Sequence, residues 1–383
     1  MASFEGERVK EVIQDNIKRR LKIAHIAPVA TTIPAEKSGS VELVSALLTE
    51  ELVRRGHDVT LFATGTTRTS ARLFATFPNG YWENIDMWPW EHYELVHLAA
   101  ACERADQFDV IQYQTAYYPM SLAFTRLIKT PMAHTLHHQP HPEQRDLWLC
   151  YPEANLVAIS NYQRGALGGL NCAAVIPHGI DLQNFRFSDK SDDYLVFLGR
   201  FTEGKGPLQA IEVAKRAGMR LLMAAPESGY YFDVIEPLVD GHQIVYLGEL
   251  GHKEKVELLG GARAMIYPMQ VGEPFGLVLI EAMACGTPVA ALAKGAAPEI
   301  VIDGVSGYTT ETLDELVDKL PLAMDLPREA VRRHAEAHYS VEAMTDSYEA
   351  LYHRLVAERE NRDAALSNGG EFEYALGDLC PSR

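Results

Sequence analysis

Long hydrophobic runs are missing from the 383-residue chain. No apolar stretch reaches the roughly 18–20 residues that a membrane-spanning helix needs. The opening residues, MASFEGERVKEVIQDNIKRR, are charged and lack the apolar centre of a secretory signal peptide. We therefore expect a cytoplasmic protein.

Cysteine is scarce and metal-binding patterns are missing. The five cysteines are an odd number and show no Cys-x-x-Cys spacing, which predicts reduced thiols rather than a disulfide framework or a zinc site. The chain contains no Asp-x-Asp, the kind of carboxylate pair that could hold a metal on a nucleotide diphosphate. We expect neither a metal nor a resident cofactor.

Basic charge is also in short supply. Fifty-two acidic residues against 35 Lys and Arg give a formal net charge of −17. This balance argues against a nucleic-acid partner, because phosphate neutralisation needs a basic surface. A small anionic ligand held by a few local cations remains compatible with it. Hydrophobic residues make up 47% of the chain, enough for a large globular core.

Short apolar runs alternate with segments of helical periodicity. Residues 22–29 and 58–64 read as strands, and 41–57 between them as a helix ending near Gly56. Strand–helix–strand units predict a parallel sheet with right-handed crossovers. The same pattern predicts further strands at 109–114, 131–138, 155–160 and 173–181.

A second alternating series follows a polar linker at about 184–192. It begins with a strand at 193–200, a helix at 207–218 and a strand at 219–225, and predicts further strands at 243–250, 262–268 and 287–292. The fold class is therefore α/β, with two Rossmann-like, doubly wound domains. The cleft between two such domains is the default ligand site.

These patterns divide the chain into five parts. We expect an N-terminal helical extension, two doubly wound domains, a C-terminal helix and a mobile tail: 1–21, 22–184, 192–340, 341–362 and 363–383. The extension would pack on the body or support a homo-oligomer. A cluster of Lys18, Arg19, Arg20 and Lys22 leaves peripheral membrane contact open, although acids interleave with it.

Two carboxylates stand in the otherwise apolar segment VGEPFGLVLIEAMACGTPVAA, residues 271–291. Glu273 lies in the loop after a predicted strand, and Glu281 lies in a helix expected to begin near Phe275. Free N–H groups of Phe275, Gly276 and Leu277 would attract an anion or an oxygen-rich ligand. Carboxylates only accept hydrogen bonds, which suits sugar hydroxyls. Alternatively, Glu273 caps the helix and Glu281 pairs with a cation.

A second candidate, FLGRFTEGKGPLQ, places Arg200 and Lys205 between the end of a strand and the start of a helix, with Pro207 at its first position. Two cations and oriented amides at such a turn form a cradle for a diphosphate. The spacing does not fit GxxxxGK[ST], so a P-loop ATPase is disfavoured. Solvated surface cations are the alternative.

The first half offers weaker candidates. Gly39 and Ser40 form a short turn before the first helix, which would point amides at the cleft. The histidines of HTLHHQPHPEQ suggest a metal, but neighbouring residues of a strand face opposite ways. One ligand-contacting histidine or a structural role fits them better. Three tryptophans at 80–95 would either stack on a ring-shaped acceptor or pack the loop.

Taken together, these motifs resemble the retaining glycosyltransferases of family 4, which have the two-domain GT-B fold. GEPFGLVLIEAMACGTPV looks like the Glu-x7-Glu signature of that family. The segments RRGHDVTLFATG, VAISNYQ, VIPHGIDLQNF, FLGRFTEGKG and GAAPEIVIDGVSGY also look like it and occur in the right order. The resemblance covers about residues 22–355. It implies that 22–184 is the acceptor-side domain, 192–340 the nucleotide-sugar-binding domain, and 341–362 a helix that crosses back to the first domain.

The resemblance implies roles for the donor-side residues. Arg200 and Lys205 would neutralise the donor diphosphate and stabilise it as the leaving group. Glu273 would contact the transferred sugar, and Glu281 the ribose hydroxyls. The amides of Phe275, Gly276 and Leu277 would hold sugar and phosphate.

For the acceptor-side domain, the resemblance implies that Gly39 approaches the phosphates and that His137 contacts the sugar. Two residues depart from the family pattern. Ser40 stands where a second glycine is usual, and Val271 where many relatives carry tryptophan. The identity of the sugar is therefore left open.

The expected activity is metal-independent, retaining transfer of a hexose-type sugar from a nucleotide diphosphate donor to an unknown acceptor hydroxyl. UDP is favoured over GDP. A nucleotide-sugar 2-epimerase of the same fold and a non-catalytic nucleotide-sugar-binding protein are the alternatives. An epimerase needs acid and base groups beside the sugar's C2, and no further set of that kind stands out.

Overall fold

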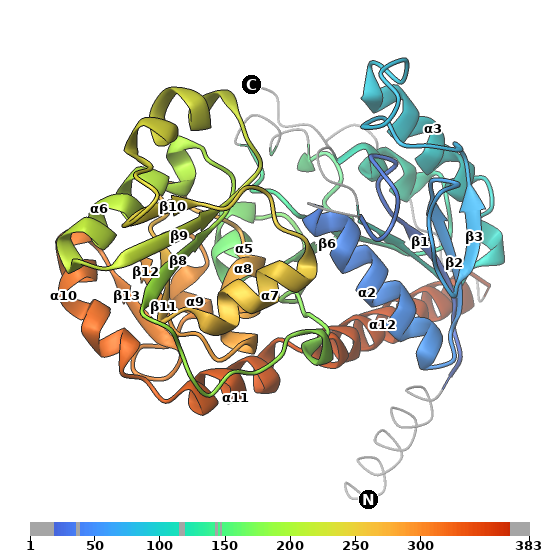
Figure 1. Cartoon of the computed structure of the whole chain (residues 1–383). Helices are drawn as coiled ribbons and strands as arrows, with labels where there is room; N and C mark the ends of the chain where they lie inside the picture. Colours follow the sequence, from blue (N-terminus) through green and yellow to red (C-terminus); the bar gives the residue numbers. More distant parts are fainter. Residues whose placement is uncertain (1–18, 36–38, 115–118, 142–144, 146–147, 368–383) are drawn as a thin grey trace, which may run out of the picture. The chain divides into compact units, whose positions relative to one another are not determined.

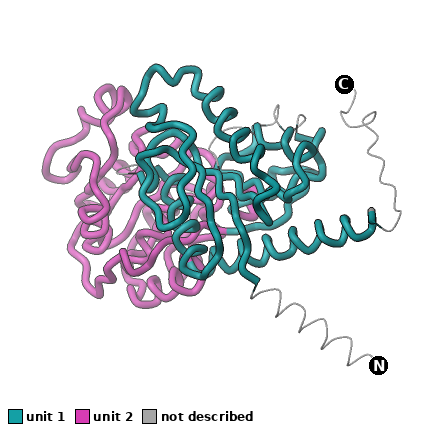
Figure 2. The backbone as a smooth tube through the Cα atoms, turned by 90° about the vertical axis from the view of Figure 1, so that its right-hand side faces the viewer, with its two compact units in different colours: residues 1–159, 164–176, 342–383 teal, residues 160–163, 177–341 magenta. Residues whose placement is uncertain are grey.

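The computed structural model describes residues 19–35, 39–114, 119–141, 145 and 148–367. The chain forms two compact units, coloured separately in Figure 2. Unit 1 comprises residues 1–159, 164–176 and 342–383, and unit 2 comprises 160–163 and 177–341. Each is described by itself below.

Unit 1 is built on one parallel sheet of seven strands in the order β3-β2-β1-β4-β5-β6-β7. Every neighbouring pair runs parallel, as the strand–helix–strand pattern predicts. The strands are β1 Lys22–Ile26, β2 Asp58–Ala63, β3 Arg72–Ala75, β4 Val110–Tyr113, β5 Met132–Thr135, β6 Asn155–Ala158 and β7 Cys172–Val175.

Helices cover both faces of this sheet (Figure 1). Helix α3 (Trp90–Cys102) and the 3-10 segment η2 (Pro119–Arg126) pack on one face, which carries Ala24, Ile26 and Ile111. Helices α2 (Ser40–Arg54) and α12 (Val341–Ser367) cover the other face of the sheet. There the Tyr352 hydroxyl donates to Gln112 Oε1 at 3.0 Å, and Tyr348 bonds Thr135 at 2.9 Å. The alternation of side chains along each strand produces this division.

Unit 2 contains a second parallel sheet, of six strands, in the order β10-β9-β8-β11-β12-β13. The strands are β8 Tyr194–Leu198, β9 Arg220–Ala224, β10 Ile244–Tyr246, β11 Ala264–Tyr267, β12 Val289–Leu292 and β13 Gly307–Thr310. The central residues of β8, β11 and β12 are buried, which fits the near-continuous apolar runs typical of a sheet covered on both faces. The predicted α/β fold class is thus confirmed.

Helices α6 (Pro207–Ala217) and α10 (Leu313–Met324) share a core with one face of the second sheet. Helices α7 (His252–Gly261) and α8 (Leu277–Ala284) contact β8 and β11, and α11 (Arg328–His338) packs on α8. The short helices are α5 Asn161–Leu167 and α9 Ala297–Ile300.

Several expectations need correction. The short outer strands β3 and β13 and helix α3 were not predicted. Residues 19–21 are not helical, and the rest of the expected N-terminal helix lies outside the described residues. Helix α12 continues to Ser367, so 363–367 are helical and belong to the preceding helix rather than to a separate segment; 368–383 lie outside the described residues. Cys102, Cys172 and Cys285 are free thiols, whereas Cys150 is disulfide-bonded, contrary to expectation.

The buried His134 makes unit 1 sensitive to acid. Its ring bonds Ser121 Oγ at 2.7 Å, and burial lowers its pKa to about 3. An unfolded chain takes up this proton near pH 6.5, so the stability contributed by neutral His134 is complete above that pH and declines toward pH 3. The decline is at most about 1.4 kcal/mol per pH unit. Between pH 7 and pH 5, we expect the free energy of unfolding of His134→Gln to fall by about 2 kcal/mol less than that of the wild type.

Urea unfolding followed by tryptophan fluorescence measures this difference, because all four tryptophans belong to unit 1. His92→Gln, at an exposed position of α3, is the matched control and should keep the wild-type pH dependence. If His134→Gln keeps the wild-type pH dependence, the acid sensitivity of unit 1 does not come from His134.

Candidate active site

The second sheet brings two site-bearing loops together. Strand β8 lies between β9 and β11, so the strand order reverses at the β8–β11 pair. In an open parallel sheet, ligands bind outside the carboxyl ends of the strands at such a switch point. The loop after β8 carries Arg200 and Lys205, and the loop after β11 carries Glu273.

Backbone contacts hold these two loops against each other. The Gln270 N–H donates to the Gly204 carbonyl at 2.9 Å. Gly206 has a φ of +71° and lies so close to Pro268 that an added Cβ would be 2.0 Å from the Pro268 carbonyl oxygen. Gly206 also caps α6, whose first residue is Pro207, as the sequence predicts. Only glycine satisfies both the angle and the space.

Lys205 and Glu273 meet across this junction. Lys205 Nζ donates to Glu273 Oε1 at 2.5 Å, and the side chains are 20% and 27% exposed. The hydroxyl of Tyr267, the last residue of β11, donates to Glu273 Oε2. Burial and the neighbouring carboxylate raise the pKa of Tyr267 well above its ordinary value, so the phenol keeps its proton. The Glu273 carboxylate is therefore held at both oxygens.

The Glu273 backbone is fixed from a third segment. Its carbonyl accepts the Ala296 N–H at 3.0 Å. Gly295 has a φ of +62°, and a Cβ there would lie 2.3 Å from the Glu273 nitrogen. The loop is thus enclosed by chain on two sides, which limits the positions open to its carboxylate.

Helix α8 begins two residues later than predicted, at Leu277. Gly276 is its N-cap with a φ of +110°, and no side chain caps it. The Leu277 N–H is among the first amides of the helix, which have no intrahelical acceptor. Phe275 precedes the helix and is buried, with its ring 5.1 Å from that of His178. The Phe275 side chain supports the loop, while the amides of the turn remain candidates for ligand contact.

Glu281 has a different partner from Glu273. It is 3% exposed on α8, and Lys255 Nζ of α7 donates to its Oε1 at 2.5 Å. The cation pairing weighed as an alternative for Glu281 is therefore present. The two glutamates therefore engage separate lysines, Glu273 with Lys205 and Glu281 with Lys255.

Arg200 is exposed and forms no ion pair with any residue in the described ranges. It follows Gly199 directly after β8, on the same loop as Lys205. The structure places the two cations in one loop but leaves Arg200 outside the Lys205–Glu273–Tyr267 network.

Gly39, Ser40 and His137 belong to unit 1, so their relation to Glu273 stays a prediction. Gly39 precedes α2, and a Cβ there would lie 2.7 Å from that of Ala35. Ser40 is exposed at the first position of α2. His137 is half-buried and follows the end of β5, so strand alternation does not govern its direction.

The histidine-rich segment shows no metal centre where it is described. Across the described part of the chain, no three or more His, Cys, Asp and Glu side chains gather as metal ligands would. His134 is a buried structural histidine. None of the described helices is long and apolar enough to cross a bilayer.

The tryptophan-rich loop is tied to the segment that follows β1. Tyr81 N–H donates to the Val29 carbonyl at 3.1 Å, and Trp82 N–H to Ala30 at 2.9 Å. Trp82 is 60% and Trp88 73% exposed, so the core-packing interpretation is wrong for these two. Their loop is bonded to the segment that follows the carboxyl end of β1, so both tryptophans stay candidates for acceptor contact.

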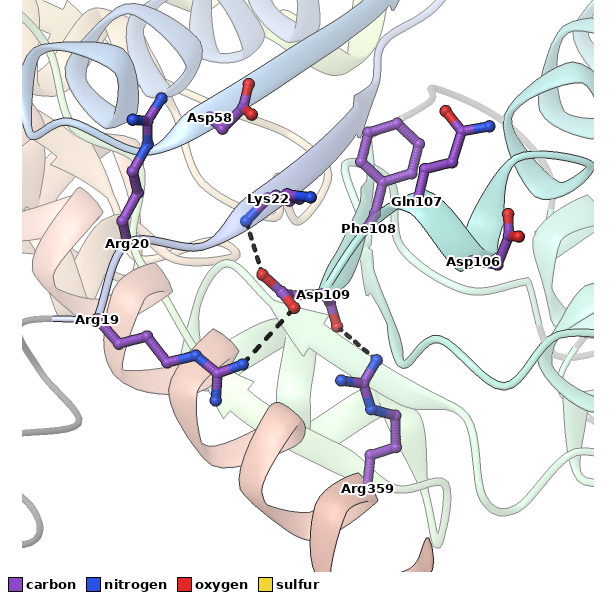
Figure 3. A pocket seen from close by; sticks show the side chains of 9 residues that line it. All are labelled: Arg19, Arg20, Lys22, Asp58, Asp106, Gln107, Phe108, Asp109 and Arg359. Atoms are coloured by element: carbon purple, nitrogen blue, oxygen red, sulfur yellow. Dashed lines mark hydrogen bonds and ion pairs between the residues drawn. The ribbon is translucent and has the colours of Figure 1, made fainter.

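A pocket of about 510 Å³ lies at the opposite ends of the strands in unit 1 (Figure 3). Arg19, Arg20, Lys22 and Arg359 line it together with Asp109. Asp109 accepts the Lys22 N–H at 2.8 Å and lies 3.8 Å from Arg19, and Arg359 donates to its carbonyl. Part of the basic cluster near the N-terminus is therefore engaged by this chain's own acid.

Sequence reasoning missed Tyr267 and Lys255. Tyr267 lies in an apolar strand pattern, but a buried tyrosine hydroxyl needs a partner, and the carboxyl edge of the sheet could supply one. Lys255 carries no such signal, because a lysine on a surface helix is ordinarily solvated.

Comparisons with known proteins agree with this arrangement. The profile described as Glycosyltransferase Family 4 matches residues 41–184, and the profile described as Glycosyl transferases group 1 matches residues 181–340. A D-inositol 3-phosphate glycosyltransferase of Mycolicibacterium smegmatis is 26% identical over 423 aligned residues, covering 92% of this chain and 95% of the relative.

Solved structures show the same fold. The glycosyltransferase AviGT4 of avilamycin A biosynthesis is 25% identical, with a TM-score of 0.66 over 88% of this chain and 98% of its own. Sucrose-phosphate synthase from Thermosynechococcus elongatus is 21% identical, with a TM-score of 0.69 over 89% of this chain and 100% of its own. Anabaena Alr3699/HepE in complex with UDP-glucose is 18% identical, with a TM-score of 0.62 over 90% of this chain and 100% of its own.

The two doubly wound units and these matches define a glycosyltransferase with the GT-B fold. The tandem profiles span residues 41–340 in the order of the chain. The protein belongs to glycosyltransferase family 4, and the family expected from the sequence is confirmed.

The close contact between the two loops predicts that alanine destabilises the protein more at Gly206 than at Gly218. Gly206 and Gly218 both have positive φ, +71° and +65°, but a Cβ at 218 would meet nothing within 4 Å. Gly218→Ala should therefore cost only about 1–2 kcal/mol of unfolding free energy for the left-handed conformation. Gly206→Ala should cost about 1–3 kcal/mol more, because its Cβ overlaps Pro268. Urea unfolding followed by circular dichroism compares them, and equal losses would show that the junction is not tight.

Proposed function

We propose that the protein transfers a hexose-type sugar from a nucleotide diphosphate donor to an acceptor hydroxyl with retention of anomeric configuration. The observation that carries the proposal is the Lys205–Glu273 contact at the β8–β11 switch point, beside the first amides of α8. One site thus presents a cation, a carboxylate and backbone N–H groups, matching a diphosphate, sugar hydroxyls and phosphate oxygens respectively.

Charge separation is what the site must stabilise. Breaking the bond between sugar and diphosphate builds negative charge on the leaving phosphate and positive charge on the anomeric carbon. Lys205 has three N–H donors and spends one on Glu273, so it can bind a phosphate oxygen without releasing the carboxylate. Arg200 and the α8 amides add further donors. Preorganised donors of this kind are strongest in a site that excludes water.

Glu273 supports the sugar rather than attacking it. Both of its oxygens already accept a hydrogen bond, and each retains a lone pair for a sugar hydroxyl. Glu281 of α8, which pairs with Lys255 of α7, is assigned to the ribose. Because Glu281 is assigned to the ribose and not to the reacting bond, the proposed transfer takes place on one face, where the departing phosphate oxygen accepts the proton of the acceptor hydroxyl.

The donor is a nucleotide sugar, with UDP tested first and GDP next. A protein of the same fold was solved with UDP-glucose, which supports starting there. Metal-independent binding follows from the proposed use of Lys205 and Arg200 as counter-charges. The mycobacterial relatives are named for an inositol phosphate acceptor, so inositol phosphates are the first acceptors to assay.

Nucleotide titration tests the donor site. We expect calorimetry with UDP, GDP, ADP and dTDP to show tight binding of one nucleotide, unchanged when Mg²⁺ is added. Lys205→Ala should weaken that binding by about 1.5–3 kcal/mol, the value of a charge-assisted contact. Lys215→Ala removes an exposed lysine of α6 and should leave it unchanged. Failure of all four nucleotides to bind would overturn the proposed function.

Glu273→Gln separates binding from chemistry. The amide keeps the shape of the side chain but loses the charge that supports the transition state. We expect nucleotide affinity within about twofold of wild type and a rate of sugar transfer or donor hydrolysis reduced by about 10²–10³-fold.

Proton NMR of the wild-type product gives its anomeric configuration, and an inverted anomer would refute the single-face mechanism.

A further inference from the structure

We propose that Tyr267 is a positioning residue, whose hydroxyl sets the orientation of the Glu273 carboxylate toward the sugar of the donor. This inference rests on the proposed function. Tyr267 ends β11 and is 4% exposed, and its hydroxyl donates to Glu273 Oε2. The residue itself need not touch the donor; it acts through the carboxylate.

The two partners of Glu273 contribute differently. Lys205 reaches its carboxylate oxygen on a flexible four-carbon stem and is partly exposed. Tyr267 has only two side-chain torsions and its ring is packed on all sides. An ammonium group at the end of a flexible stem supplies charge but little direction. The rigid phenol therefore fixes the direction, while Lys205 supplies the charge.

The Tyr267 hydroxyl also connects the carboxylate to helix α8. A Cβ built on Gly276, the N-cap of α8, would lie 2.9 Å from the Tyr267 oxygen. The hydroxyl thus occupies the space between Glu273 and the turn whose amides face the ligand. One side chain sets the spacing between the sugar-binding carboxylate and the phosphate-binding amides.

Removing this hydroxyl should affect the sugar more than the nucleotide. In Tyr267→Phe, Glu273 keeps its charge and its lysine but loses the rigid donor at Oε2. We expect UDP, or whichever nucleotide binds wild type, to bind within about twofold. The additional affinity of the corresponding nucleotide sugar should fall about fivefold or more, and kcat for donor hydrolysis by about 10–100-fold.

Tyr194→Phe is the matched control. Its hydroxyl donates to the Leu258 carbonyl at 2.8 Å in the same unit, so the substitution also removes one partly buried hydroxyl bond. It should leave both the sugar-dependent affinity and kcat at the wild-type level. Equal effects in the two variants would overturn the inference, because they would reflect general loss of packing.

A double-mutant cycle separates positioning from stability. If Tyr267 acts through Glu273, then Tyr267→Phe adds no further loss of kcat to Glu273→Gln. Losses that multiply would overturn the inference, even if Tyr267→Phe proves less stable than wild type. If wild type binds no nucleotide, the proposed function fails and this inference with it. If wild type binds and Tyr267→Phe matches it in affinity and kcat, only this inference fails.

Discussion

The contact between Lys205 and Glu273 depends on the backbone that surrounds it. An ammonium and a carboxylate can meet at 2.5 Å only if the loops after β8 and β11 stay in register. That register is set by the near contact of Gly206 with Pro268 and by the Gln270–Gly204 hydrogen bond. The chemistry of the site is thus carried by side chains, but its geometry is carried by glycines and main-chain polar groups.

This arrangement explains why the site is compact although its residues are far apart in the chain. Parallel strands present their carboxyl ends at one edge, so loops separated by some seventy residues become neighbours. Each loop alone offers little: a lysine in one, a glutamate in the other. Their juxtaposition, with the start of α8 beside them, gives a surface with both signs of charge within one hydrogen bond of each other.

Much of this could be predicted from the sequence. The buried strands have continuous apolar runs, and the loops that follow them carry the charged residues, so the fold and the loop positions of Lys205 and Glu273 were predictable. The short strand β3 is half-exposed and lacks such a run, which is why it was missed. Helix α8 starts after Gly276 because its φ of +110° lies outside the helical range, and no residue pattern revealed that angle.

Side-chain partners were less predictable than positions. For Glu281 the sequence allowed either a ligand contact or a cation partner; the partner is Lys255 of α7, and its approach depends on helix packing. Tyr267 looked like a core residue because nothing in a strand reveals where its hydroxyl points. In unit 1, Trp82 and Trp88 are exposed because their loop is hydrogen-bonded to the segment that follows β1. Local composition does not reveal that attachment.

The position of α12 has a consequence for synthesis on the ribosome. Unit 1 begins with the first strand of the chain, yet Tyr348 and Tyr352 of α12 complete its polar core at Thr135 and Gln112. Residues 177–341, which contain the whole second sheet, emerge before α12 does. Domains generally fold as units while the chain is made. Here the sheet of the later-encoded unit is complete before α12 is made, and the earlier unit waits until then with part of one face of its sheet uncovered.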